Sequence, residues 1–330
     1  MNSFERVRAL GWFFIAMFYF IFAQIVADHA ANGLSSGDSF ELVSRLILLF
    51  LLLVGYAAMG YAGQRQREPI KQMGLMRRPG WGREFALGAA LGWGGILACL
   101  IPIVFFGGLV VTVWTSPHQL LLLLVDLAVL AVAALTEEIA FRGYPFQRLI
   151  EALGPTLATL VMMSIFALIH LRNPGASGAS TLTTALFGLV LAVAYLRTRA
   201  LWLGWGLHFA WNASMGILFG LPISGLTTFS PLVSSNASGP IWITGGNYGL
   251  EGSATAVLVL LVLIIVLVKV TRDYAYKYNQ PVIVAGGIPV DIDAAARRQH
   301  EAAMGTTAAA PALVQIVQAP PVPGETRKLE

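Results

Sequence analysis

Long apolar stretches alternate with short polar connections over most of the chain. Most of these stretches hold roughly 18 or more residues with few charges, the length that an α-helix needs to cross the hydrocarbon core of a bilayer. The pattern therefore predicts an all-α, polytopic membrane helix bundle with about eight transmembrane helices. The expected spans are 9–27, 42–63, 85–112, 119–141, 155–171, 180–196, 200–220 and 254–270.

Composition agrees with this class of protein. Hydrophobic residues make up 57% of the 330 residues and charged residues only 12%, whereas an ordinary soluble domain carries about 25% charged residues. The lipid bilayer is therefore the expected surrounding. The net charge of +4 arises mainly from the polar connections, so it does not indicate a nucleic-acid partner.

Positive charges favour alternate connections, which predicts how the chain is oriented. Twelve of them fall on one set: Arg6, Arg8, Arg65, Arg67, Lys71, Arg77, Arg78, Arg83, Arg142, Arg148, Arg197 and Arg199. The other set holds Arg45 and Arg172. Because Lys and Arg resist translocation, the first set is expected in the cytoplasm together with both termini. We expect a multi-pass protein of the plasma membrane, in a bacterium the inner membrane.

The chain is expected to have two parts. Residues 1–278 should form the membrane-embedded bundle, in which the Gly-, Ser-, Thr- and Pro-rich stretch 221–253 is an outer loop. Residues 279–330 are rich in Ala, Pro and Val and have few aromatic residues. Such a composition buries too little apolar surface to fold alone, which predicts a disordered cytoplasmic tail.

Two adjacent carboxylates, Glu137 and Glu138, interrupt the fourth apolar stretch. A charge at the centre of a spanning helix costs roughly 2.5–3.5 kcal/mol even on insertion scales. Arg142 follows Glu138 at i+4, which places the two opposite charges on one helical face. If the helix continues to Arg148, Glu137 lies roughly 16 Å deep. The spacing therefore predicts an internal ion pair rather than two solvated acids.

Other polar groups interrupt two further stretches. His170 lies in the fifth, and His208 and Asn212 lie at i,i+4 in the seventh. A single histidine in a span is usually a hydrogen-bonded packing element. Polar groups inside a membrane are rare, however, and normally face a bundle interior or an aqueous cavity. We therefore expect these groups and Glu137 to converge on one cavity.

These residues form three ordered motifs. They are E-E-x-x-x-R (Glu137, Glu138, Arg142), F-x-x-x-H (Phe166, His170) and H-x-x-x-N (His208, Asn212). Their order resembles the CPBP family of intramembrane proteases, also called the CaaX protease or Abi family, which includes the type II CaaX prenyl endopeptidases. The resemblance covers about residues 119–215. It implies an intramembrane endopeptidase acting on a peptide or protein substrate that is hydrophobic or lipid-modified.

The resemblance also implies roles for these residues in hydrolysis by activated water. Glu137 would accept a proton from water, and His170 would orient that water or shuttle the proton. His208 and Asn212 would donate hydrogen bonds to the tetrahedral oxyanion. Glu138, paired with its arginine, would hold these groups in place.

Alternatives stay open at this point. Glu137, His170 and His208 could instead bind Zn²⁺ and leave a fourth position for water. The chain lacks H-E-x-x-H, so we prefer a scheme that requires no cofactor. A non-catalytic membrane immunity or scaffold protein is the second functional class. A proton-coupled transporter is the third, and it is weakened because the sequence has no evident internal repeat.

Overall fold

The computed structural model describes residues 3–229, 232–271, 282–283 and 289–290. The chain divides into two compact units, 1–275 and 276–330. In the second unit, the described residues form an antiparallel pair of short strands, β3 (Val282–Ile283) and β4 (Pro289–Val290). The predicted tail, 279–330, otherwise lies outside the described residues, so its disorder stays a prediction.

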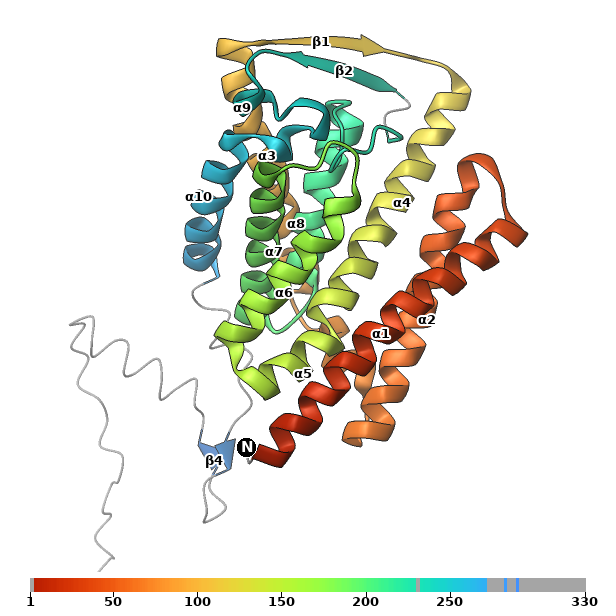
Figure 1. Cartoon of the computed structure of the whole chain (residues 1–330), viewed down its shortest axis with the longest axis vertical. Helices are drawn as coiled ribbons and strands as arrows, with labels where there is room; N and C mark the ends of the chain where they lie inside the picture. Colours follow the sequence, from red (N-terminus) through yellow and green to blue (C-terminus); the bar gives the residue numbers. More distant parts are fainter. Residues whose placement is uncertain (1–2, 230–231, 272–281, 284–288, 291–330) are drawn as a thin grey trace, which may run out of the picture. The chain divides into compact units, whose positions relative to one another are not determined.

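Helices make up most of the first unit, which confirms the predicted all-α membrane bundle (Figure 1). They are α1 (Ser3–Leu34), α2 (Phe40–Gln64), α3 (Trp81–Phe106), α4 (Pro117–Arg142), α5 (Tyr144–Leu153), α6 (Pro155–Ile169), α7 (Gly178–Thr198), α8 (Trp202–Ala213), α9 (Ile241–Thr244) and α10 (Ala254–Val270). Short 3₁₀ turns are η1 (Gly37–Ser39), η3 (His170–Arg172), η5 (Gly246–Tyr248) and η6 (Leu250–Gly252), and π turns are η2 (Lys71–Leu75) and η4 (Ser214–Leu218). Among the described residues, six helical segments are long and apolar enough to cross a membrane, and α10 is a shorter apolar helix. The chain is a multi-pass membrane protein.

Helix α1 carries large apolar side chains on its exposed face and small ones on its buried face. In α1, Phe14, Phe18 and Phe22 are exposed, whereas Ala16 and Ala23 are buried against neighbouring helices. This is the reverse of a soluble helix. Lipid tails are as apolar as these side chains, so packing between membrane helices favours small residues that let backbones approach closely.

Close backbone contact fixes α8 against α3. A Cβ added at Gly88 would lie 2.1 Å from the carbonyl oxygen of Leu203, and one at Gly92 would lie 2.3 Å from that of Leu207. Any side chain larger than hydrogen would push the two helices apart. The G-x-x-x-G spacing on α3 thus positions α8, the helix that carries His208.

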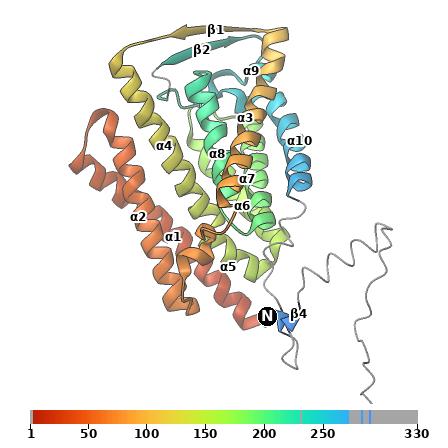
Figure 2. The ribbon, with the colours of Figure 1, turned by 180° about the vertical axis from the view of Figure 1, so that it is seen from behind.

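The transmembrane helices run between two distinct ends of the bundle. One end, here called the basic end, consists of connections 65–80, 143–154 and 199–201, and the other, the loop end, consists of 35–39, 107–116, 170–177 and 214–253. Two strands, β1 (Gly108–Val113) and β2 (Val233–Ser238), pair antiparallel in the register Gly108 to Ser238. Both strands cross the loop end, and α5 lies at the basic end, in both views (Figures 1 and 2).

The structure corrects several predicted boundaries. The third span was expected to reach 112, but α3 ends at Phe106 and the following residues form β1, whose Val and Thr side chains favour a strand. The seventh span, 200–220, is a shorter helix, α8, extended by the π turn η4. The expected outer loop, 221–253, contains β2, α9 and two 3₁₀ turns.

The helix carrying the carboxylates ends close to the predicted boundary of 141 and does not meet the condition of continuing to Arg148. It ends at Arg142 because the backbone turns at Gly143, where a Cβ would lie 2.4 Å from the carbonyl oxygen of Ile139. A separate helix, α5, follows. The depth of about 16 Å derived for Glu137 from a continuous helix therefore loses its basis. Arg142, counted among the connection charges, is in fact buried.

Candidate active site

Glu138 and Arg142 form a buried ion pair at the end of α4, where each is at most 2% exposed. Nη1 of Arg142 donates to Oε1 of Glu138 at 3.3 Å, and Nη2 donates to the carbonyl oxygen of Gly188 at 3.1 Å. The guanidinium also lies over the ring of Phe166, 4.7 Å from its centroid, an attractive cation–π arrangement. The charge of Glu138 is therefore balanced within the protein.

The imidazole of His208 lies between the two glutamates. Its Nδ1 is 3.1 Å from Oε1 of Glu138, and its Nε2 is 3.8 Å from Oε2 of Glu137. Because a carboxylate accepts, Nδ1 carries the proton and donates it to Glu138. Gly204, one turn earlier on α8, makes room for this approach, since a Cβ there would lie 2.9 Å from Oε2 of Glu138.

His170 stands where α6 ends and η3 begins. Its Nδ1 donates to the carbonyl oxygen of Phe166 at 2.7 Å, so the side chain satisfies a carbonyl of the last helical turn. A carbonyl can only accept, so Nδ1 carries a proton, and in the neutral imidazole Nε2 then has a lone pair. The ring also packs on that of Phe166, with centroids 4.6 Å apart.

One cavity of about 240 Å³ joins four of the predicted site residues: Glu137, His170, His208 and Asn212. They come from α4, η3 and α8, and Phe141 and Phe166 complete the same wall. Glu138 and Arg142 do not line the cavity but lie behind it. The two adjacent glutamates thus have different surroundings, since the side chain of Glu137 is 27% exposed and that of Glu138 is 1% exposed.

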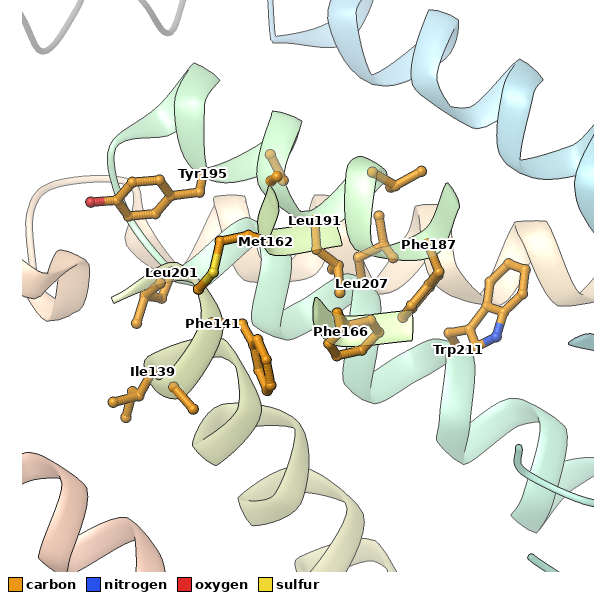
Figure 3. Close-up of a cluster of buried hydrophobic side chains, with 14 of the residues drawn as sticks. Ile139, Phe141, Met162, Phe166, Phe187, Leu191, Tyr195, Leu201, Leu207 and Trp211 are labelled. Atoms are coloured by element: carbon orange, nitrogen blue, oxygen red, sulfur yellow. The ribbon is translucent and has the colours of Figure 1, made fainter. Parts of the chain in front are cut away.

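Aromatic side chains pack against the imidazole of His208 and the guanidinium of Arg142. The ring of Phe187 meets that of His208 edge-on, 5.3 Å between centroids, and Phe166 meets Phe141 in the same way at 5.2 Å. Figure 3 shows these aromatic residues together with Leu207 and other buried side chains. Such a frame lowers the local dielectric, which strengthens the hydrogen bonds to Glu138.

Sequence reasoning missed Glu251, which also lines the cavity. This buried carboxylate, in η6, accepts hydrogen bonds from Nε1 of Trp211 at 3.0 Å and from N and Oγ of Ser224 at 2.7 and 2.6 Å. It joins the loop end to α8 beside Asn212. One signal could have found it, because it is the sole charged residue in 214–253.

The side chains do not form a metal site as they stand. In the part of the chain that the structure describes, no group of three or more His, Cys, Asp or Glu side chains is arranged to hold a metal ion. The alternative zinc set, Glu137, His170 and His208, lines one cavity without forming such a group.

Comparison with known proteins finds a match to the central helices of the bundle. A family model described as Type II CAAX prenyl endopeptidase Rce1-like matches residues 118–214. No curated protein and no solved structure matches the chain. The matched segment runs from α4 to the start of η4 and contains all six predicted site residues. The family model thus agrees with the resemblance read from the motifs: residues 118–214 of this chain are similar to the Rce1-like type II CAAX prenyl endopeptidases.

Proposed function

We propose that this protein is an intramembrane endopeptidase that hydrolyses a peptide bond with activated water. The observation that carries the proposal is the cavity on which Glu137, His170, His208 and Asn212 converge inside a bundle of apolar helices. The match of residues 118–214 to a family of endopeptidases supports the class of reaction. The apolar walls of the cavity favour a hydrophobic or lipid-modified peptide or protein as substrate.

Glu137 is the proposed general base. Its Oε2 is buried and has no hydrogen-bond partner among the described residues, so it keeps a lone pair for a proton. As the water oxygen attacks the peptide carbonyl carbon, the water proton passes to Glu137 and the carbonyl π electrons move to oxygen. When the tetrahedral intermediate collapses, the C–N bond breaks and the amine leaves with that proton.

His170 is the proposed partner of the attacking water. Its Nδ1 proton is committed to the carbonyl of Phe166, so Nε2 can accept a hydrogen bond from water. A water held by both Glu137 and His170 is oriented with an oxygen lone pair toward the substrate. Such positioning lowers the entropic part of the barrier.

His208 and Asn212 are the proposed donors to the oxyanion. Because Nδ1 of His208 already donates to Glu138, only a protonated Nε2 can donate to the substrate, and this role requires the imidazolium. The charges of Glu137 and Glu138 balance that cation. The amide of Asn212, one turn further on α8, supplies a second donor at the same cavity wall. Removing one donor of this kind typically costs about 10²–10³ in rate.

Cleavage of defined peptides tests the proposal. The purified protein in nanodiscs is mixed with a library of hydrophobic peptides, with and without a prenyl group, and products are identified by mass spectrometry. We expect cleavage that falls by about 10²–10⁴-fold in Glu137→Gln, the usual contribution of a general base. Glu68→Gln, an exposed control acid paired with Lys71, should retain it. Full activity of Glu137→Gln would refute the mechanism, and no cleavage by the native protein would refute the function.

A further inference from the structure

The cavity of the proposed active site extends toward one end of the bundle only. Besides the site residues, it is lined by Gln24 and Arg45 in the parts of α1 and α2 near the loop end, and by Ser224, Phe229 and Glu251 of the loop end itself. None of the described residues that line it belongs to a connection of the basic end.

A second cavity continues the first toward the outside. It has a volume of about 580 Å³ and lies between α2, α4 and the loop. The residues that it shares with the first cavity are Glu41, Arg45, Val129, Leu226 and Phe229. It adds Thr227 and Thr228, both exposed. A path therefore runs from Glu137 between α2 and α4, beneath residues 226–229.

The basic end is closed by packed side chains. The five residues that follow Glu137 on α4, residues 138–142, are each at most 2% exposed. Arg142 bonds across to the backbone of α7 at Gly188, and Phe141 packs on Phe166 of α6. Among the described residues, these packed side chains separate the site cavity from the basic end.

The two ends of the bundle differ in the number of Lys and Arg residues in their connections. The connections of the basic end hold seven Lys and Arg: Arg65, Arg67, Lys71, Arg77, Arg78, Arg148 and Arg199. Those of the loop end hold Arg172 alone, and Arg45, within α2, is paired with Glu41 at 2.7 Å. Lys and Arg are retained on the cytoplasmic side during insertion. This charge distribution predicts that the basic end is the cytoplasmic one, and the cavity opens at the other end of the bundle.

We infer that the enzyme takes its substrate from the non-cytoplasmic side of the membrane. This inference rests on the proposed function and names the substrate class for that same site: a peptide segment exposed on the outer face, which enters between α2 and α4 beneath residues 226–229. The scissile bond then reaches Glu137 from the loop end. A substrate confined to the cytoplasm has no path to the site.

Cysteine labelling tests the sidedness without a substrate. The chain has one cysteine, Cys99, and it is buried, so introduced cysteines report with little background. We expect Thr227→Cys to react with a membrane-impermeant maleimide in intact cells. Arg67→Cys, an exposed position of the basic end, should react only after the cells are opened. The reverse pattern would overturn the inference.

Cleavage in sealed vesicles tests the path itself. A peptide identified in nanodiscs is added outside, or trapped inside, vesicles whose protein orientation is measured by the same labelling. We expect cleavage only from the loop end. We also expect a bulky maleimide to block cleavage in Thr227→Cys but not in Ile241→Cys, which is exposed at the loop end and lines neither cavity. Cleavage only from the basic end would refute this inference and leave the proposed function standing, whereas a library in which the native protein cleaves no peptide in nanodiscs would refute the function.

Discussion

Nδ1 of His208 lies 3.1 Å from Oε1 of Glu138, and this hydrogen bond joins α8 to α4 across 70 residues of sequence. It gives the second glutamate a task in the site although that side chain does not line the cavity. Glu138 binds Arg142 on one side and turns the imidazole on the other. The other ring nitrogen is thereby directed toward Glu137.

Substitution of the proposed base should separate activity from stability. Glu137→Gln keeps the size of the side chain and removes a carboxylate whose buried oxygen has no hydrogen-bond partner among the described residues. We expect cleavage to be lost while the thermal unfolding temperature in detergent stays close to that of the native protein. A strongly destabilised Glu137→Gln would contradict the assignment.

Substitution of the buried glutamate should instead cost stability. Glu138→Gln leaves Arg142 buried without its counter-ion and weakens the bond to His208. Breaking a buried pair in this way costs about 3–5 kcal/mol, and cleavage should fall as well. The exposed pair of Glu68 and Lys71 offers a control, since losing an exposed pair costs about 0–1 kcal/mol. Equal unfolding temperatures for Glu138→Gln and Glu68→Gln would show that the buried pair does not stabilise the fold.

Two glycines of α3 should respond differently to the same change. A Cβ at Gly88 would lie 2.1 Å from the carbonyl oxygen of Leu203, whereas one at Gly94 would meet nothing within 4 Å. We expect Gly88→Ala to cost about 1–3 kcal/mol through overpacking and to lower cleavage by displacing α8. Gly94→Ala should stay within about 1 kcal/mol of the native protein. Thermal unfolding of both variants measures the difference, and equal stability would mean that α3 and α8 tolerate separation.

Glu251, the buried carboxylate of the loop end, should stabilise the site through its hydrogen bonds. Glu251→Ala removes the acceptor for Trp211 and for two groups of Ser224. Hydrogen bonds to charged groups contribute about 1.5–3 kcal/mol each, so we expect a clear drop in unfolding temperature and in cleavage. Glu251→Gln, which keeps one acceptor oxygen, should recover part of both. A Gln variant as impaired as the Ala variant would show that the hydrogen bonds do not matter.

Removal of metal should leave cleavage unchanged. The proposed steps use only Glu137 and the histidines, and Nδ1 of His208 is already bonded to Glu138. We therefore expect full activity after prolonged treatment with a strong chelator and no gain on adding Zn²⁺. Metal analysis of the same samples is the check. Stoichiometric bound metal that is lost together with activity would contradict the water mechanism as written.

The route by which a substrate would reach the site could not be predicted from the local sequence pattern. The depth derived for Glu137 assumed that its helix continues to Arg148, but the backbone turns at Gly143 and a separate helix follows. The pairing of β1 with β2 joins segments more than a hundred residues apart. Glu251 lies in a stretch whose composition indicates only a loop, and its burial depends on Trp211 and Ser224.

The sequence by itself determined the membrane helices and the ion pair of Glu138 with Arg142. Both are local, because a helix in lipid satisfies its own backbone hydrogen bonds and places residues at i,i+4 on one face. Tertiary structure alone decided that His208 reaches Glu138 and that the cavity opens at the loop end. Those features depend on how closely helices from distant parts of the chain pack, and this distance is set by side-chain volumes at the contacts, such as the missing Cβ of Gly88 and Gly204.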